Sequence, residues 1–190
     1  MKNRGKQEEI MVAAAEVIAE RGFHGSPMAM IAKKAGVASG TIYVYFKSKE
    51  ELIEALFQQM DLSFREVLQE GYPADKSFKE RFMYTGMTIM DYFASRPLDF
   101  RYLQQFHNSP YGAAKRREKM SRFDSPDLIR ELFEEGIKQG ALKDMPLIIM
   151  LSTVFGAMVN VLRDHVYGLI RLDESLMTQV LEACWDCVKK

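Results

Sequence analysis

Residues 28–46 of the chain read MAMIAKKAGVASGTIYVYF, and this stretch decides the fold of the N-terminal end. Gly36 is the natural left-handed stop for a helix, because glycine adopts positive φ angles without steric cost. The stretch therefore predicts a short helix, a tight turn at 36–38 and a second short helix over 39–46. Two helices joined by such a turn are typical of a helix-turn-helix motif.

The second of these helices combines small, hydroxyl-bearing and aromatic side chains. Ile42 and Phe46 are expected to face a small core, which leaves the other side chains of the helix pointing outward. Hydroxyls and phenols can bond phosphate oxygens, and the N-terminus of a helix offers free N–H groups to phosphate. Gly40 would let the backbone approach a groove closely. The residues expected to contact double-stranded DNA are Ser26, Ser39, Gly40, Thr41, Tyr43, Val44, Tyr45, Lys47 and Lys49.

Charge is distributed unevenly along the chain. The whole sequence has 26 Lys and Arg against 26 Asp and Glu, so its formal net charge is zero. Residues 1–49 carry eight basic residues against four acidic ones, a net charge of +4, and the remaining residues carry a net charge of −4. A basic head on an acidic body favours a polyanion as the partner of the head.

The rest of the chain has the helix start and stop signals of a helical protein. Ser26 before Pro27 predicts an N-cap, and Ser48 with Glu51 three residues later predicts a capping box that opens a long helix. Strand signals are nearly absent. Helices are predicted over 10–21, 48–70, 76–95, 98–107, 125–140, 146–167 and 174–188, and none is predicted between 108 and 124. The sequence thus predicts an all-α chain with a helix-turn-helix domain over 1–47 and a helical bundle over 48–190.

Composition is that of an ordinary globular protein. The chain has 190 residues, of which 47% are hydrophobic and 27% are charged. No apolar run approaches the roughly 18–20 residues that span a bilayer, and no signal-peptide core follows the basic start. Two cysteines do not make a secreted disulfide framework. A cytoplasmic protein without a membrane partner is therefore expected.

The segment IAKKAGVASGTIYVYFKSKEELIEALF, residues 31–57, resembles the DNA-binding signature of the tetracycline-repressor (TetR) family of bacterial regulators. The preceding EEIMVAAAEVIAERGFHGSPM fits the first helix of that family. The resemblance implies a homodimer with a three-helix DNA-binding head and a six-helix body for effector binding and dimerisation. It also implies a ligand-responsive repressor on a palindromic operator.

Matched residue by residue, the resemblance places four side chains where the family commonly contacts DNA: Thr41, Tyr43, Tyr45 and Lys49. Ser39 falls at a variable base-reading position. The chain departs from the family pattern at Ala38, Ser39 and Val44, which offer few base-specific hydrogen bonds. The motif therefore predicts how DNA is held better than which sequence is chosen.

An adaptable apolar pocket is expected in the body. The chain has 13 methionines and 12 phenylalanines, and methionine fills irregular space in binding pockets. The effector is accordingly expected to be small and apolar. Candidate lining residues are Phe82, Met83, Met87, Met90, Tyr102, Phe106, Phe133, Phe155 and Met158, with His107, Gln104 and Asn160 as polar candidates.

The last two helices carry apolar residues around much of their circumference. A helix of a monomer needs one core-facing side, so the excess apolar surface favours a second copy of the chain as partner. In the TetR family these helices pair across a two-fold axis, and Gly156 and Ala157 would allow close approach. The expected interface consists of Leu151, Phe155, Val159, Leu162, Val180, Leu181, Cys184 and Trp185.

Other functions have weaker support in the sequence. Cys184 and Cys187 form a C-x-x-C motif, but it lies at the end of the last helix rather than at a helix N-terminus, which favours packing over redox chemistry. No phosphate loop, nucleophile elbow or zinc-binding helix is present, so neither an enzyme nor a bound metal or cofactor is expected. The alternative is a helical small-molecule carrier or redox bundle that does not bind DNA.

Overall fold

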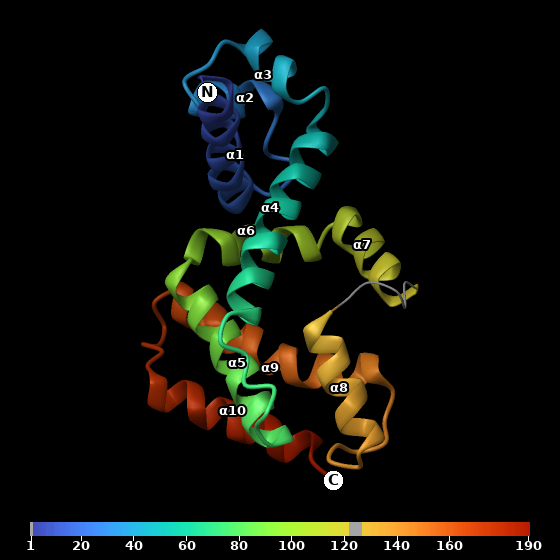
Figure 1. Ribbon diagram of the computed structural model, residues 1–190. Helices are drawn as coiled ribbons and strands as arrows, with labels where there is room; N and C mark the ends of the chain where they lie inside the picture. Colours follow the sequence, from blue (N-terminus) through green and yellow to red (C-terminus); the bar gives the residue numbers. More distant parts are fainter. Residues whose placement is uncertain (1, 122–126) are drawn as a thin grey trace. The chain divides into compact units, whose positions relative to one another are not determined.

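The computed structural model describes residues 2–121 and 127–190. These residues form ten helices and no named strand, which confirms the all-α prediction (Figure 1). The helices are α1 Lys2–Arg21, α2 Met28–Lys34, α3 Ser39–Tyr45, α4 Lys49–Gln69, α5 Phe78–Ser95, α6 Pro97–His107, α7 Pro110–Ser121, α8 Leu128–Lys138, α9 Leu147–Val166 and α10 Glu174–Val188. Part of the predicted helix 125–140 falls on residues outside the described ranges.

Packing divides the described chain into two compact units. The first contains the residues up to Ser63 together with 96–121, and the second contains 64–95 together with 127–190. Residues 96–121 were expected in the body, but the helices that they form, α6 and α7, pack with the N-terminal helices instead. Helix α4 contributes its first part to one unit and its last part to the other. A functional boundary at residue 48 stays a prediction.

The core of the first unit joins the helix-turn-helix to α6. Ile31 and Ile42 are fully buried, as are Tyr102 and Phe106 of α6. The ring of Phe106 stacks on that of Phe57 with 4.2 Å between centroids. Burial raises the pKa of Tyr102, whose phenol donates a hydrogen bond to the backbone carbonyl of Ile53 at 2.9 Å. The short helices α2 and α3 are therefore held by tertiary packing rather than by their own length.

The turns of the helix-turn-helix follow the sequence signals closely. Gly22 ends α1 at φ 67° and Gly36 ends α2 at φ 66°, both in the left-handed region that glycine favours. The hydroxyl of Ser48 accepts from the backbone N–H of Glu51 at 3.2 Å, which confirms the predicted cap of α4. The Glu51 carboxylate accepts in return from the backbone N–H of Lys47 at 2.8 Å.

Helix α7 was missed in the sequence, so the seven described helices from α4 onward exceed the six expected. The signal for α7 was nevertheless present in Ser109 and Pro110. The Ser109 hydroxyl accepts from the backbone N–H of Gly112 at 3.3 Å, and Pro110 occupies the first helical position. Lys115 adds an ion pair with Glu54 of α4 at 3.4 Å, a contact that sequence spacing cannot show.

The second unit is built on α5, which packs against α8, α9 and α10 (Figure 1). Arg81 of α5 forms a two-pronged ion pair with Glu135 of α8, with N–O distances of 2.8 and 2.5 Å. This pairing raises the pKa of Arg81 and lowers the pKa of Glu135. Trp185 of α10 lies over α5, with its ring 5.4 Å from that of Phe82. The four helices thereby enclose a common interior.

Candidate DNA interface and ligand cavity

Helix α3 presents a continuous outward face. Ile42 is its one fully buried residue, whereas Tyr43 is 54% exposed and Val44 is 77% exposed. Ser39 and Gly40 are exposed as well. Ser39 and Gly40 precede Tyr43 and Val44 by about one helical turn, so the two pairs share one side of the helix. The structure thus brings four of the nine predicted DNA-contacting residues together on an open surface.

Three further predicted contacts lie beside this face. Lys47 is exposed just beyond the end of α3. Thr41 and Tyr45 are half-buried, and Tyr45 packs against the core of the unit. Each of these side chains retains some exposed surface, so a role at the edge of the interface remains a prediction.

Gly40 meets no requirement of the fold. Its φ angle is not positive, and a Cβ atom added there would have no neighbour within 4 Å among the described residues. Glycine also weakens a helix by about 1 kcal/mol relative to alanine. The fold does not need a glycine at this position. A glycine does leave space for another molecule to approach the helix closely.

Ser26 was placed wrongly at the DNA surface. Its side chain is fully buried, and its hydroxyl lies 2.6 Å from the carbonyl of Gly22 and 3.2 Å from that of Val17. It therefore donates to the end of α1 and does not cap α2, whose N-cap residue is Pro27. The serine satisfies carbonyls that the helix itself leaves open.

Lys49 has a partner inside the chain. Its ammonium group donates a hydrogen bond to the backbone carbonyl of Phe23, and burial lowers its pKa. This contact ties the first turn of α4 to the segment after α1. A phosphate contact by Lys49 stays a prediction, and it would compete with this hydrogen bond.

We expect Lys49→Ala to lower the thermal midpoint of unfolding by a few degrees in the absence of DNA. A hydrogen bond from a charged donor contributes about 1.5–3 kcal/mol, and 1 kcal/mol shifts the midpoint by about 2–4 °C in a chain of this size. Differential scanning calorimetry would measure the shift, with exposed Lys47→Ala as the matched control. Equal midpoints in the two variants would show that the hydrogen bond to Phe23 contributes no stability.

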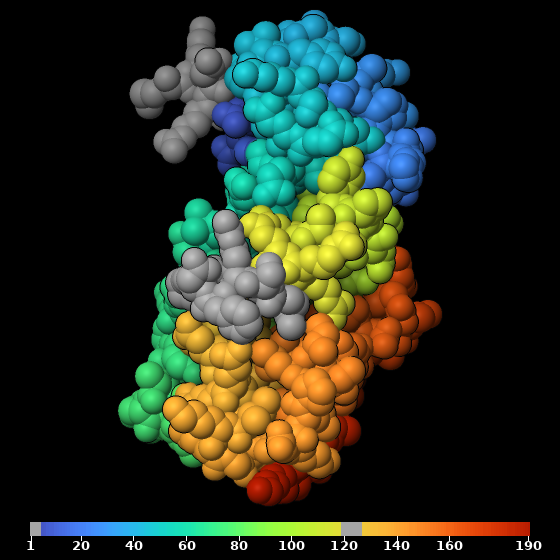
Figure 2. Space-filling model, turned by 90° about the vertical axis from the view of Figure 1, so that its right-hand side faces the viewer, coloured from blue at the N-terminus to red at the C-terminus, as the bar shows by residue number. Residues whose placement is uncertain are grey.

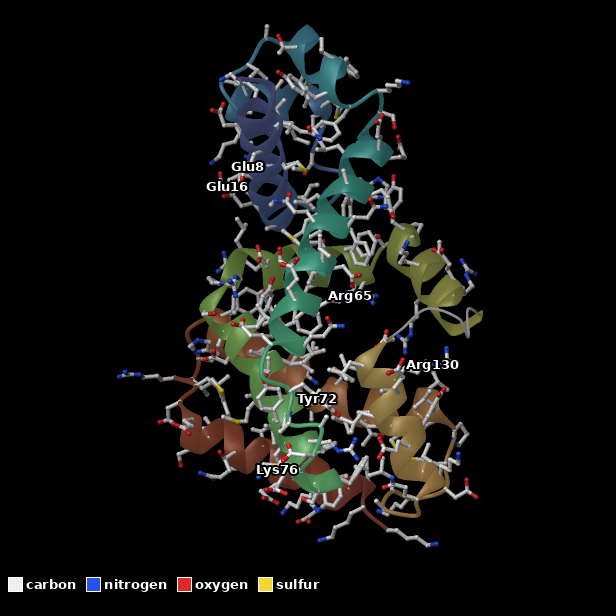
Figure 3. All side chains as sticks on the ribbon, viewed as in Figure 1. Glu8, Glu16, Arg65, Tyr72, Lys76 and Arg130 are labelled. Atoms are coloured by element: carbon white, nitrogen blue, oxygen red, sulfur yellow. The ribbon has the colours of Figure 1, made fainter. Side chains whose placement is uncertain are left out.

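One side of α1 is acidic. Glu8 and Glu16 extend from the same side of the helix (Figure 3). The Glu16 carboxylate pairs with the ammonium group of Lys34 at 2.9 Å, and this hydrogen bond raises the pKa of Lys34. Lys34 is thereby partly neutralised, so it adds less to the positive field of the head than its formal charge indicates.

Helices α5, α8, α9 and α10 enclose a small apolar cavity in the second unit. Its volume is about 10 Å³, which is room for about one water molecule. Figure 2 shows α8 and α9 side by side at the surface, in two shades of orange. The lining residues are Phe82, Thr85, Gly86, Ile89, Leu132, Phe133, Val154, Phe155, Met158 and Leu181.

The cavity only partly matches the predicted pocket. Phe82, Phe133, Phe155 and Met158 do line it. Tyr102 and Phe106 were placed wrongly, because they belong to the core of the first unit. Gln104 and His107 lie on α6 of the first unit, so they were placed wrongly as well. Met83, Met90 and Asn160 do not line this cavity, and Met87 lines a second hollow with a volume of about 340 Å³, so a ligand contact by these four residues stays a prediction.

Six lining residues were missed by sequence reasoning. On α5 the signal was available, because Phe82, Thr85, Gly86 and Ile89 recur at the spacing of one helical face. On the other helices no local pattern separates lining residues from ordinary core. The choice there depends on which sides of four helices meet.

The structure also corrects part of the predicted dimer interface. Leu162, Leu181 and Cys184 are buried inside their own chain, so they were placed wrongly at a partner surface. Leu151, Phe155, Val159, Val180 and Trp185 are half-buried. They therefore keep surface that a partner can cover.

Helix α9 is more apolar than expected. Its 20 residues, with a mean hydropathy of 1.6, are long and apolar enough to cross a membrane by length and composition. The prediction that no apolar run approaches the length of a membrane span was therefore wrong. The apolar run is interrupted by the polar residues Ser152, Thr153 and Asn160. Only 22% of the apolar stretch is buried within the chain, and Ile149 is 54% exposed.

The C-x-x-C pair occupies two different environments. Cys184 is buried and its thiol lies 3.8 Å from the carbonyl oxygen of Val154, whereas Cys187 is exposed. Burial raises the pKa of Cys184, which makes its reactive thiolate form scarcer. Within the described ranges no group of three or more potential ligands could hold a metal ion.

The helix-turn-helix with its exposed second helix defines the class as DNA-binding regulators. The model of bacterial regulatory proteins of the tetR family matches residues 10–56, and that of the tetracyclin repressor-like C-terminal domain matches residues 57–190. The chain belongs to the TetR family of bacterial transcriptional regulators. Members of this family are DNA-binding transcription factors and not enzymes.

Relatives of known name and structure agree with this membership. The fatty acid metabolism regulator protein of Bacillus subtilis is 30% identical over 191 residues, which cover 92% of this chain and 93% of that protein. The crystal structure of the regulator FadR from Bacillus subtilis, in complex with stearoyl-CoA, is 26% identical with a TM-score of 0.65, covering 93% of this chain and 96% of that chain. A TetR family regulator from Marinobacter aquaeolei shares the fold, with a TM-score of 0.83 at 21% identity and full coverage of both chains.

Proposed function

We propose that this regulator is a repressor that binds a palindromic operator as a homodimer and leaves it when a small apolar effector enters the second unit. The observation that carries the proposal is the exposed face of α3, where four of the predicted contacts lie together. A transcription factor acts where the DNA is, so the cytoplasm is its proposed location.

The α3 face is suited to holding the DNA backbone. Ser39 and Tyr43 offer hydroxyls to phosphate, and Gly40 leaves room for close approach. Val44 can contact a thymine methyl group, because it is the most exposed apolar side chain of the helix. In a dimer, two such helices would enter successive major grooves, about 34–36 Å apart.

The proposed dimer rests on the exposed apolar surface of α9. A soluble monomer rarely leaves so much of an apolar helix uncovered, and a second copy would bury it. Gly156 supports this arrangement, because a Cβ atom there would meet no neighbour of its own chain among the described residues. The remaining candidates from the predicted interface are Leu151, Phe155, Val159, Val180 and Trp185.

The proposed effector is a long-chain acyl compound. The cavity lining is apolar apart from one hydroxyl, and the FadR relative was crystallised with stearoyl-CoA. A volume of about 10 Å³ cannot hold an acyl chain, so the walls must move apart when the effector enters. Helix α4 continues from the second unit into the first, which gives such a movement a path to the helix-turn-helix.

The decisive experiment is a footprint of the purified protein on the promoter next to its own gene, repeated with stearoyl-CoA. A symmetric protected site whose affinity falls steeply with salt is expected, because bound lysines and arginines release phosphate counterions. Loss of protection on adding stearoyl-CoA would support the effector class. Binding of stearoyl-CoA without any DNA protection would instead favour the carrier.

We expect Tyr43→Ala to weaken operator binding about tenfold or more without changing the thermal midpoint of unfolding. The side chain is more than half exposed, so its removal should change the free energy of unfolding little. The affinity should fall more, because a dimer would lose one DNA contact in each of its two half-sites. Fluorescence anisotropy with labelled operator would measure the change. Tyr167, a tyrosine of the second unit that is 64% exposed, gives the matched control Tyr167→Ala, and equal affinities in both variants would contradict this surface.

A further inference from the structure

Thr85 of α5 carries a buried hydroxyl whose role in the fold is unexplained. The residue is 3% exposed, and its Oγ1 atom has no hydrogen-bond partner in the described part of the chain. Threonine in a helix commonly donates to the carbonyl one turn earlier, as Thr178 does to Glu174 at 2.8 Å. A buried hydroxyl without a partner destabilises the fold, so its presence needs another explanation.

The hydroxyl belongs to the wall of the cavity. Of the ten lining residues, Thr85 alone has a side-chain oxygen or nitrogen atom. The other nine are glycine, aliphatic, aromatic or methionine residues from α5, α8, α9 and α10. Thr85 is therefore the one group of the lining that can orient a ligand by a conventional hydrogen bond.

The surroundings restrict the partner of this hydroxyl to a neutral group. No lining residue carries a charge, and a charged ligand group buried there would lose its hydration without compensation. Arg81, one turn earlier on α5, is not among the lining residues, and its two terminal nitrogens bond Glu135, although its buried Nε has no hydrogen-bond partner within the described residues. A carbonyl oxygen fits these conditions, because it accepts a hydrogen bond and needs no counter-charge.

We propose that Thr85 donates its hydroxyl proton to a carbonyl oxygen of the effector, as in the thioester group of an acyl compound. This inference rests on the proposed function, since it assigns a group of the effector to one residue of the same cavity. The carbonyl would sit between the aromatic rings of the lining, with the acyl chain among its aliphatic residues. Any charged part of the effector would stay outside the cavity.

Two lining contacts indicate where the wall must move. Phe155 lines the cavity and is also half-exposed, so its side chain separates the interior from the surface. Between α5 and α10, a Cβ atom at Gly86 would overlap the side chain of Leu181, which shows how closely these two helices approach. We therefore expect the cavity to open by displacement of Phe155 rather than by separation of α5 from α10.

The test compares two ligands that differ in one carbonyl group: stearoyl-CoA and S-octadecyl-CoA, its thioether analogue. We expect wild-type protein to bind the thioester about tenfold more tightly, equivalent to about 1.4 kcal/mol. Thr85→Val, which keeps the shape and loses the hydroxyl, should bind both ligands equally. Thr85→Ser should retain the preference, and Thr178→Val is the matched control on an exposed threonine. Isothermal titration calorimetry would give the dissociation constants.

A second readout does not depend on any ligand. Thr85→Val should raise the thermal midpoint of the ligand-free protein by about 2–4 °C, because it removes a buried hydroxyl without a partner. A lower midpoint would overturn the proposal by revealing that the hydroxyl is bonded within the fold. Absence of a thioester preference in the wild type, or its persistence in Thr85→Val, would overturn it as well.

The operator assay separates this inference from the proposed function. If both ligands release operator DNA with equal potency, the role of Thr85 fails and the acyl-responsive repressor stands. If the thioester binds with the expected preference while DNA binding is unaffected, the role of Thr85 stands and the proposed repressor mechanism fails.

Discussion

Replacing Gly40 by leucine is expected to lower the affinity for operator DNA at least about a hundredfold while the chain keeps its fold. Gly40 lies on the exposed face of α3, and a Cβ atom added there would meet no neighbouring part of the described chain within 4 Å. A leucine side chain would instead fill the space between α3 and the groove. In a dimer the obstruction occurs in both half-sites, and a loss of about 1.4 kcal/mol in each multiplies to about a hundredfold.

Gly40→Ala gives this prediction a graded test. Alanine should stabilise α3 by up to about 1 kcal/mol through its higher helix propensity, yet it should still weaken DNA binding relative to glycine. Affinity measured by anisotropy and stability measured by calorimetry should therefore change in opposite directions. Ala114→Leu on α7, another exposed helical position, is the control for an added leucine. Unchanged affinity in Gly40→Leu would show that α3 does not enter the groove with this face.

Ala157→Arg is the second large effect, and it should convert the dimer into a monomer. Ala157 is exposed on α9 next to Gly156, where close approach of a partner helix is proposed. An arginine in an apolar interface leaves an unpaired buried charge in each protomer, which costs several kcal/mol. Arginine is also a good helix former, so the monomer itself should remain helical. Analytical ultracentrifugation would measure the mass.

Loss of the dimer should carry a large loss of operator binding. Two linked heads gain about 10²–10⁴ in affinity over a single head, because the second head binds at a high effective concentration. Ala114→Arg places the same residue on an exposed helix of the first unit and should leave mass and affinity unchanged. A dimeric Ala157→Arg variant would move the proposed interface away from this part of α9.

Much of the DNA-binding head could be predicted from local sequence. The spacing of Ile42 and Phe46 identified the buried side of α3, and both side chains are buried in the structure. Gly36 and the Ser48 cap fixed the helix ends, since positive φ angles and caps are properties of single residues and their near neighbours. The same periodicity implied that the remaining α3 side chains lie outside.

The partners of polar side chains could not be predicted in the same way. Ser26 has the spacing of an N-cap, yet it turns back to the carbonyls at the end of α1. Lys49 sits in a DNA-binding signature, yet its ammonium group bonds the carbonyl of Phe23, which is 26 positions away. Both outcomes depend on where a distant segment lies, and sequence spacing does not encode that distance.

By itself the sequence determined the helical class, the helix-turn-helix and the outward face of α3, because these follow from backbone preferences and a 3.6-residue period within short segments. Only the tertiary structure decided that α6 completes the core of the head, that Leu181 and Cys184 are interior, and that the cavity carries one unpartnered hydroxyl at Thr85. These features arise where faces of helices far apart in sequence meet. An apolar stripe predicts which side of a helix is buried, but it does not predict which other helix packs against that side.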